Sequence, residues 1–373
     1  MPRKKISDDT TLSEKTDQEG EVQCREGKTR ERMDSIWLPT GSTILDIVVG
    51  AGRGLGHEAG QAINLVSESQ GGKTALVNEA IANARFLYGD KFKWIYDSTC
   101  EGGNTFDTKT LYGFDIIPKK GAVRSQTIQE AFGNMMGFLD ELADDEFGIY
   151  ALDSIDAVVS DEIEEISEGR LTAFRKGKDF DKGSYQGQKP KFLSSEFLPQ
   201  IVAKAESKNC LVIIVSQLRD NVGGGGYAPK DRVSNGRALL YYCSSRIWLK
   251  TKADIEKLGK PIGVIVQAET RKARGPHPYR KGNYIFYYEY GIDDIGGNID
   301  YLYDLRTEDK AEFVKDAEKK KLVWDGNEYT RRELIKFVED NNLHKELRDR
   351  VIAQWNAIEA KASEEVTCRK RRF

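Results

Sequence analysis

The sequence predicts an α/β fold with a mainly parallel central sheet, an antiparallel extension of that sheet and a small α+β C-terminal lobe. Three observations predict it. Apolar runs alternate with segments of helical spacing from residue 62 to residue 217, strand-like runs then follow one another closely, and the chain after about Asp300 is mainly helical and charged. Strands that alternate with helices form a parallel sheet covered on both faces, whereas closely spaced alternating strands indicate antiparallel pairing.

The elements are expected in the following order. Strands of the parallel part are predicted at 62–67, 91–97, 147–153 and 210–217, with helices at 74–88, 128–143 and 194–209. The extension is predicted from strands at 245–251, 263–270 and 283–290. We expect three parts in the chain, namely an N-terminal arm at 1–35, a core at 36–300 and a C-terminal lobe at 301–373 with a basic tail.

Composition narrows the class of protein. The chain has 373 residues, of which 39% are hydrophobic and 31% charged, and its formal net charge is −3. Five scattered cysteines and three histidines suggest neither a disulfide framework nor a zinc site. Residues 1–35 are polar and charged and are expected to be disordered or to order on a partner, and no segment approaches the length of a membrane span. These features predict a soluble protein of the cytoplasm that does not bind membranes.

The stretch "VSESQGGKTALVNEA" at 65–79 contains the end of a phosphate-binding P-loop. In such a loop, backbone N–H groups surround the phosphates, a lysine neutralises them and a hydroxyl holds Mg²⁺. Lys73 and Thr74 fit the last two roles, but Ser67 stands where the motif has its first glycine. We expect an unusual backbone angle there and a slightly strained loop. The motif alone gives even odds between a nucleotide site and a chance strand-to-helix turn. The predicted loop consists of Ser67, Glu68, Ser69, Gln70, Gly71, Gly72, Lys73 and Thr74.

Two acidic positions follow other predicted strands. Asp153 ends the apolar run "GIYALD", and a carboxylate at such a strand tip can hold Mg²⁺, although it can also simply cap the next helix. Its place downstream of a P-loop favours the metal. The run "KWIYD" leads into "STCEGG", where Glu101 is the candidate for the base that orients water and Asp97 is its rival. A solvated loop acid is nearly as good an explanation of Glu101.

Two long basic segments suit a nucleic-acid backbone. The segment at 219–237 contains four consecutive glycines, and the segment at 167–192 carries seven lysines and arginines. A flexible basic loop with an aromatic residue is typical of single-stranded DNA binding. The candidate DNA contacts are Arg170, Arg175, Lys176, Arg219, Tyr227, Lys230, Arg232, Asn235, Gly236 and Arg237.

Taken together, these motifs resemble the RecA family of DNA strand-exchange recombinases, including its diverged phage-encoded members. The resemblance begins at "TGSTILDIVVGAGRGLG" (40–56), continues through the P-loop, "YALDS" and "IIVSQLRDNVG", and includes "NGRALLYYCSSRIWL", "ETRKARGPHPYRKGNYIFYYEYGID" (269–293) and "KLVWDGNEYTRRELIKFVEDN" (321–341). It implies a RecA-type P-loop ATPase core that binds ATP and Mg²⁺. Thr99 occupies the position where the family has its catalytic glutamate.

The resemblance also implies roles that composition does not show. Gln217 would sense the terminal phosphate, Lys272 and Arg274 would reach the ATP of a neighbouring subunit, and Phe106 is a loose candidate for stacking on adenine. The implied function is ATP-dependent homologous recombination by a helical filament on single-stranded DNA that pairs with duplex DNA. Single-strand-binding and loader proteins would be further partners. The alternatives are a hexameric helicase and a weakly hydrolysing recombinase paralogue or mediator.

Overall fold

The computed structural model describes residues 35–68, 71–99, 106–177, 188–220, 231–233, 236–307 and 311–367. The chain divides into the units Met1–Ser35 and Ile36–Phe373, and the elements below all belong to the second. No helix in the described part is both long enough and apolar enough to span a bilayer. The predicted boundary between core and lobe near residue 300 stays a prediction.

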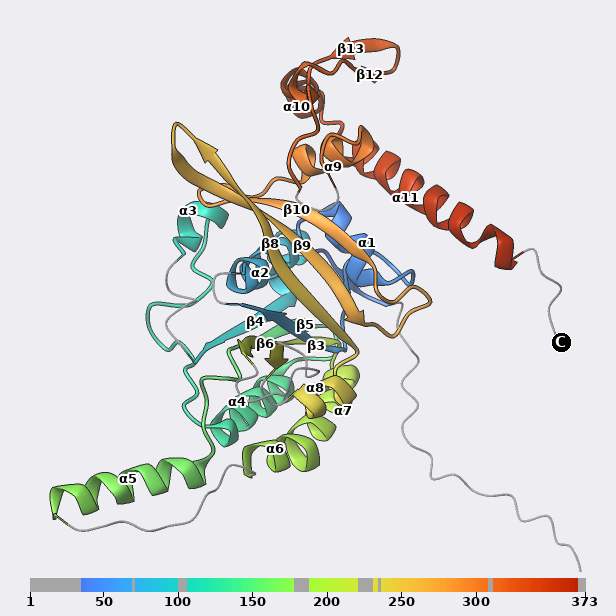
Figure 1. Cartoon of the computed structure of the whole chain (residues 1–373). Helices are drawn as coiled ribbons and strands as arrows, with labels where there is room; N and C mark the ends of the chain where they lie inside the picture. The colour runs from blue at the N-terminus through green and yellow to red at the C-terminus, as the bar shows by residue number, and fades with distance from the viewer. Residues whose placement is uncertain are drawn as a thin grey trace, which may run out of the picture. The chain divides into compact units, whose positions relative to one another are not determined.

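A mixed sheet of nine strands forms the centre of the second unit (Figure 1). Its order is β11-β10-β9-β8-β3-β6-β5-β4, and β7 pairs with β6 beside this path. The pairs from β8 to β4 are parallel, whereas those from β8 to β11 are antiparallel. The predicted parallel sheet with an antiparallel extension is therefore confirmed. The strands are β3 (Ala62–Ser67), β4 (Phe92–Ser98), β5 (Phe147–Asp153), β6 (Cys210–Asp220), β7 (Asp231–Val233), β8 (Ser245–Lys257), β9 (Lys260–Lys272), β10 (Lys281–Tyr287) and β11 (Gly291–Ile292).

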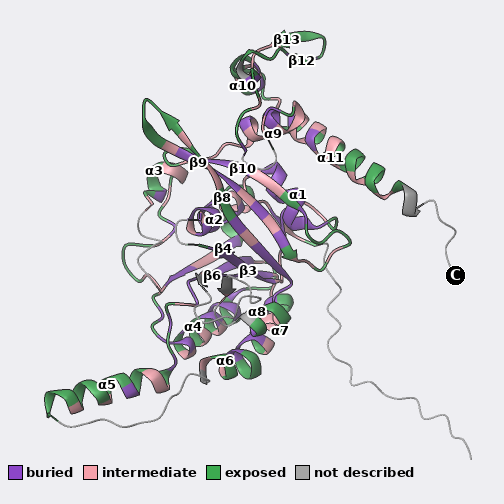
Figure 2. Ribbon diagram, in the orientation of Figure 1, coloured by how far each residue is buried: buried purple, intermediate pink, exposed green. Residues whose placement is uncertain are grey.

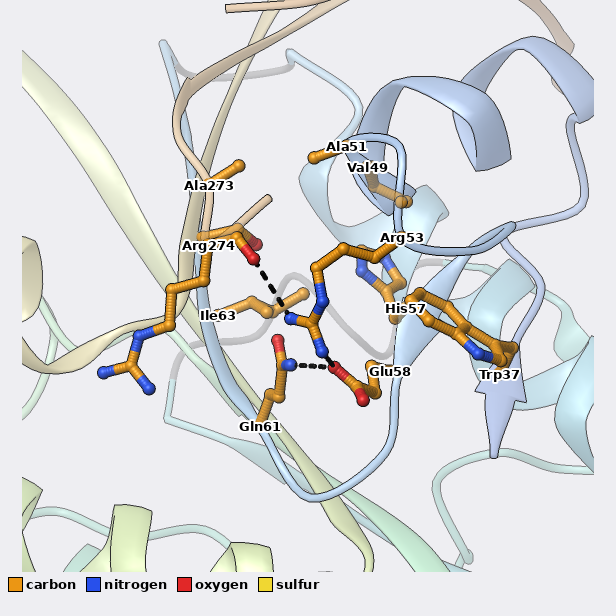
Figure 3. Close-up of a pocket in the computed structure, with 12 residues that line it drawn as sticks. Trp37, Val49, Ala51, Arg53, His57, Glu58, Gln61, Ile63, Ala273 and Arg274 are labelled. Carbon is orange, nitrogen blue, oxygen red and sulfur yellow. Dashed lines mark hydrogen bonds and ion pairs between the residues drawn. The ribbon is translucent and has the colours of Figure 1, made fainter. Parts of the chain in front are cut away.

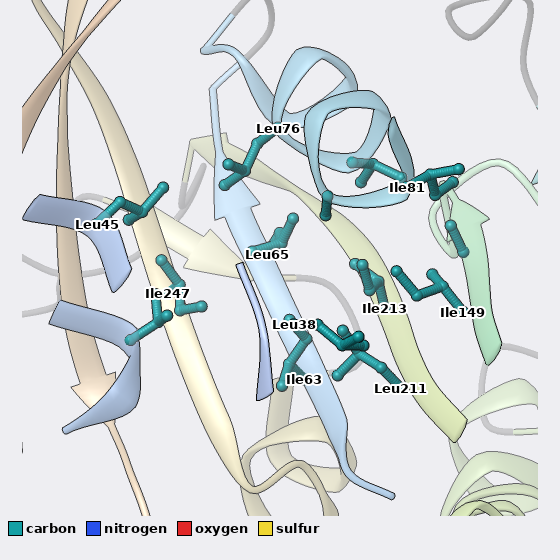
Figure 4. Close-up of a cluster of buried hydrophobic side chains, with 14 of the residues drawn as sticks. Leu38, Leu45, Ile63, Leu65, Leu76, Ile81, Ile149, Leu211, Ile213 and Ile247 are labelled. Atoms are coloured by element: carbon teal, nitrogen blue, oxygen red, sulfur yellow. The ribbon is translucent and has the colours of Figure 1, made fainter. Parts of the chain in front are cut away.

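Helices cover both faces of the sheet, as buried strands require. On one face lie α1 (Thr43–Gly50) and α2 (Lys73–Tyr88), and on the other lie α4 (Ile128–Glu141), α7 (Leu198–Ser207) and α8 (Gly236–Tyr242) (Figure 1). Figure 4 shows aliphatic side chains of the first face, where Leu76 and Ile81 of α2 pack over strand residues such as Ile213. Figure 2 shows buried strands at the centre, with exposed residues on the outer sides of α4 and α7, whereas α1 is buried along its whole length.

Local signals fix several helix starts. Thr127 and Glu130 form a capping box at α4, and Thr330 and Glu333 form another at α10. The remaining elements are β1 (Trp37–Leu38), β2 (His57–Glu58), α3 (Thr108–Tyr112), α5 (Asp161–Arg175), α6 (Gln188–Phe192), a π-helical turn (Leu193–Phe197), α9 (Asp294–Leu302), β12 (Leu322–Trp324), β13 (Asn327–Tyr329), α10 (Arg331–Asp340) and α11 (His344–Thr367), with 3₁₀ turns at Gly89–Lys91 and Ala317–Lys319.

Two basic segments differ from the expected loops. The segment predicted as a loop at 167–192 begins inside α5 and ends in α6, while residues 178–187 lie outside the described part. The first turn of α5 is acidic and its last turn carries Arg175, so the charges complement the helix dipole, a signal that the loop prediction missed. The segment at 219–237 is also shorter as a loop than expected, because β6 continues to Asp220 and pairs with β7.

Candidate nucleotide-binding site

The phosphate-binding loop joins the buried strand β3 to helix α2. Ser67 is the last residue of β3, and Gly72 is the N-cap of α2 with a left-handed φ of 83° that glycine adopts without strain. The unusual backbone angle predicted for Ser67 is wrong, because this residue continues the extended strand. Glu68 and Gly71 lie in the described part of the loop, whereas Ser69 and Gln70 lie outside it.

The Ser67 side chain fits because a glycine lies opposite it. A Cβ atom at position 71 would meet Ser67 Oγ at 2.3 Å and Ser67 Cβ at 2.6 Å. The serine thus occupies the space that Gly71 leaves open. Its hydroxyl also accepts a 2.7 Å hydrogen bond from Lys73 Nζ. Serine in place of the first glycine is therefore compatible with an intact loop.

Lys73 folds back over the loop from the start of α2. Its ammonium group donates to the carbonyl of Ser67 at 3.1 Å and to the carbonyl of Glu68 at 2.6 Å, and the residue is only 8% exposed. Phosphates held by the N–H groups of a helix start would meet this cation. The arrangement is the one expected of the P-loop lysine.

Thr74 and Asp153 are brought together from positions 79 residues apart. The Thr74 hydroxyl donates to Asp153 Oδ2 at 2.8 Å, and the Tyr96 hydroxyl donates to the same oxygen at 2.6 Å. Asp153 ends β5, which pairs with β4, so its carboxylate reaches the start of α2 across the carboxyl edge of the sheet. Tyr96 was missed by sequence reasoning, although its alternate position on β4 places it on the α2 face.

The Thr74 and Asp153 pair fits a magnesium ion. Mg²⁺ is usually held by one or two protein oxygens, with water and substrate phosphates completing its octahedron. Within the described residues, no group of three or more histidine, cysteine or acidic side chains forms a metal cage. Thr74 and Asp153 would supply the protein ligands, and the ion would neutralise phosphate charge.

Of the two candidate bases, Asp97 and Glu101, the structure describes only Asp97. Asp97 is fully buried and accepts hydrogen bonds from Ser125 N–H at 2.9 Å, the Ser125 hydroxyl at 2.6 Å and the Tyr150 hydroxyl at 2.8 Å. Its side chain points to the sheet face opposite α2, because Tyr96 before it points toward Asp153. This geometry assigns Asp97 a structural role. Glu101 lies outside the described residues.

The Thr99 side chain is hydrogen-bonded to the turn that follows β5. Its hydroxyl accepts from the Ser154 N–H at 2.7 Å and donates to the Ser154 carbonyl at 2.8 Å. Thr99, at the position where the resemblance implies a glutamate, therefore makes a structural contact here.

Gln217 lies at the same edge of the sheet as the loop. It is paired with Ser67 in the parallel register of β6 and β3, and its N–H donates to Asp156 Oδ2 at 2.7 Å. Phe106 lies just before α3 and is half-buried, with its ring edge-on to Phe286 at 6.3 Å between centroids. The stacking role of Phe106 and the sensing role of Gln217 stay predictions.

Lys272 and Arg274 lie in a separate surface region. Lys272 Nζ donates to the carbonyls of Leu240 and Tyr241 at the end of α8, the second at 3.0 Å. Burial first, and then the charges of Arg274 and Arg246, lower the pKa of the Lys272 ammonium, while Cys243 acts in the opposite direction.

Figure 3 shows the pocket beside Arg274, and none of the described residues of the phosphate-binding loop lines it. Arg53 binds Glu58 there and donates to the Arg274 carbonyl at 3.2 Å, while the Arg274 guanidinium points away from Glu58 (Figure 3). The exposed Arg274 follows Lys272, whose register partner Arg246 lies beside Asn64 near the start of β3, whereas the phosphate loop begins at the other end of that strand.

The candidate DNA contacts divide into three groups. Arg170, Arg175, Lys176 and Arg237 are exposed, the first two on α5, Lys176 directly after it and Arg237 at the start of α8. Arg219 and Arg232 are paired in the register of β6 and β7, and Gly236 begins α8. Tyr227, Lys230 and Asn235 lie outside the described residues.

The fold and the loop define a P-loop α/β protein, and comparison with known proteins shows which family it is similar to. Residues 148–293 match the family model described as the RecA N-terminal domain. The chain is 24% identical over 287 residues to "Protein RecA" of Campylobacter lari, covering 76% of this chain and 75% of that protein. It is 26% identical over 279 residues to "Protein RecA" of a Sulfurovum species, covering 74% and 72%. The chain is therefore similar to the RecA family and distantly related to bacterial RecA proteins.

Proposed function

We propose that this protein is a DNA-dependent ATPase of homologous recombination that forms filaments on single-stranded DNA and exchanges strands with duplex DNA. One observation carries the proposal: Lys73, Thr74 and Asp153 gather at the sheet edge where Gln217 also lies. The similarity to RecA proteins over three quarters of the chain supports it. A phage origin and a cytoplasmic location, both expected from the sequence, stay predictions.

The roles of Lys73, Thr74 and Gln217 rest on chemistry at this edge, whereas those of Lys272, Arg274 and Glu101 rest on the family resemblance. Lys73 and the loop N–H groups bind the phosphates of ATP, and Thr74 and Asp153 hold Mg²⁺. Gln217 responds to the terminal phosphate and passes its state along β6. Lys272 and Arg274 act on the nucleotide of the neighbouring subunit and neutralise charge in the transition state. Glu101 orients the attacking water.

The DNA-binding role rests on exposed cations and on the family resemblance. Arg170, Arg175 and Lys176 project from one end of α5 beside Phe174, which is 82% exposed. Cations with an aromatic ring suit the backbone and bases of single-stranded DNA. The C-terminal lobe and its basic tail collect duplex DNA, and single-strand-binding and loader proteins are further partners.

A DNA-stimulated ATPase assay tests the proposal. We expect hydrolysis that rises on addition of single-stranded DNA, together with filaments in electron micrographs. Lys73→Ala is the matched variant that must lose the activity. Rings in place of filaments would support a hexameric helicase. DNA binding without hydrolysis would support a mediator, an alternative that the committed Thr99 hydroxyl favours.

A further inference from the structure

The turn formed by residues 154–158 directly follows Asp153 and is held from several sides. The Thr99 hydroxyl is hydrogen-bonded to both the N–H and the carbonyl of Ser154. The Ile155 N–H donates to the carbonyl of Val215 on β6 at 3.0 Å. Lys189 at the start of α6 donates to the carbonyls of Ile155 and Val158, both at 2.5 Å. The turn therefore contacts both segments that lead to the candidate DNA-binding residues.

Asp156 is the residue of this turn that reaches the end of β6. Its Oδ2 accepts the 2.7 Å hydrogen bond from the Gln217 N–H, and its Oδ1 is buried without a hydrogen-bond partner in the described part of the chain. An unpaired buried oxygen costs about 1–3 kcal/mol. Asp156 therefore does not maximise the stability of the fold at this position. Its hydrogen bond is better explained by a role in positioning the backbone of Gln217.

Gln217 lies between the phosphate loop and the β6–β7 ribbon, so a contact to its backbone can influence both. It is aligned with Ser67 of the phosphate loop, and three residues later β6 ends in the ribbon that it forms with β7. Asp156 lies three residues after Asp153, the candidate magnesium ligand. A short rigid path thus runs from the metal-side carboxylate through the turn to the backbone of Gln217.

We propose that Asp156 is a positioning residue that fixes the backbone of Gln217 and thereby couples the nucleotide site to the β6–β7 ribbon. The inference rests on the proposed function, because it assumes that nucleotide and DNA bind to the two ends of this path. Asp156 touches neither ligand in this account. Without its carboxylate the N–H of Gln217 loses its acceptor, and the end of β6 no longer follows movements of the turn.

The test uses the full chain as four proteins: unaltered, Asp156→Ala, Asp156→Asn and Asp161→Ala. Asparagine keeps an oxygen that accepts the Gln217 N–H, while Asp161 is an exposed acid on α5 whose removal controls for lost charge. Three quantities are measured: hydrogen exchange at the Gln217 amide, the ATP concentration for half-maximal hydrolysis without DNA, and the stimulation of hydrolysis by single-stranded DNA. Thermal melting confirms that each variant folds.

For Asp156→Ala we expect exchange at Gln217 to speed up about tenfold, the equivalent of one hydrogen bond, and DNA stimulation to fall by a similar factor. The half-maximal ATP concentration without DNA stays unchanged, and Asp156→Asn and Asp161→Ala behave like the unaltered protein. Full stimulation in Asp156→Ala, or equal loss in Asp156→Asn, overturns the inference. If the unaltered protein shows no stimulation, the proposed function fails first and the coupling falls with it.

Discussion

Ser67 and Gln217 face each other at the carboxyl ends of the parallel strands β3 and β6. Neighbouring strands are spaced by about 4.8 Å. The residue that opens the phosphate loop and the residue proposed to sense the terminal phosphate are therefore adjacent, although they lie 150 positions apart in the sequence. This adjacency is what the proposed sensing role of Gln217 requires.

The space shared by Ser67 and Gly71 gives a compensating pair of substitutions. Gly71→Ala should weaken ATP binding strongly, because the new Cβ would lie 2.3 Å from Ser67 Oγ. Ser67→Gly removes both close atoms, and the next nearest is the Glu68 carbonyl oxygen at 3.3 Å, so the double variant should regain binding. Nucleotide titration of the three variants measures this. A double variant as weak as Gly71→Ala would show that the loop has another arrangement.

Lys73→Ala should weaken ATP binding strongly. The ammonium lies over the loop, and charge-assisted hydrogen bonds contribute about 1.5–3 kcal/mol each, so an affinity loss of about 100-fold is expected. Lys91→Ala is a suitable control, because Lys91 is exposed and pairs only loosely with Asp145 at 3.6 Å. Normal DNA-stimulated hydrolysis in Lys73→Ala would refute the loop assignment.

Tyr96→Phe should change the response to magnesium. The phenol hydroxyl donates to Asp153 Oδ2 at 2.6 Å and helps to hold that carboxylate beside Thr74. Losing a hydrogen bond to a charged group costs about 1.5–3 kcal/mol, so the Mg²⁺ concentration for half-maximal ATPase should rise about tenfold or more. Metal-free nucleotide binding should not change. An unaltered magnesium dependence, with Tyr288→Phe as the exposed control, would contradict the metal assignment.

Arg274→Ala should separate binding from cooperative hydrolysis. The side chain is exposed and lies near the start of β3, whereas the phosphate loop begins at the other end of that strand, so nucleotide binding by the monomer should persist. ATPase of the filament should fall by about 10³-fold, the lower end of arginine-finger effects. Lys272→Ala should in addition lower the melting temperature, because it removes hydrogen bonds to the end of α8. Filament ATPase that survives the loss of both cations would rule out their action on a neighbouring subunit.

Asp46 should make stability depend on pH. Burial raises the pKa of this carboxyl to about 6, although Thr40 and Arg348 oppose the shift. Between about pH 4 and pH 6 the folded state then binds more protons than the unfolded state, so this group's contribution to stability is lost as the pH rises.

Asp46→Asn should therefore gain stability relative to the unaltered protein by roughly 3 kcal/mol between pH 4 and pH 7. Urea unfolding at several pH values measures the difference. Asp349→Asn, at an exposed site on α11, should show no such trend. A constant difference for Asp46→Asn across this range would contradict the expected titration.

The sequence by itself determined where the strands and helices lie along the chain. The strand predicted at 147–153 is found at Phe147–Asp153, and the predicted helix at 74–88 is α2 beginning one residue earlier. Apolar runs and helical periodicity are local signals, so neighbouring residues are enough to reveal them. The same signals identified Lys73, Thr74 and Asp153 as candidates.

Only the tertiary structure decided which of these residues meet. The contact of Asp156 with the Gln217 N–H, the support of Asp153 by Tyr96 and the burial of Asp97 against Tyr150 join residues that are 53 to 61 positions apart. Such contacts depend on strand register and on which face each side chain takes, and no short stretch of sequence contains that information. The sheet therefore followed from local patterns, whereas the partners at its edge followed from the way the strands align.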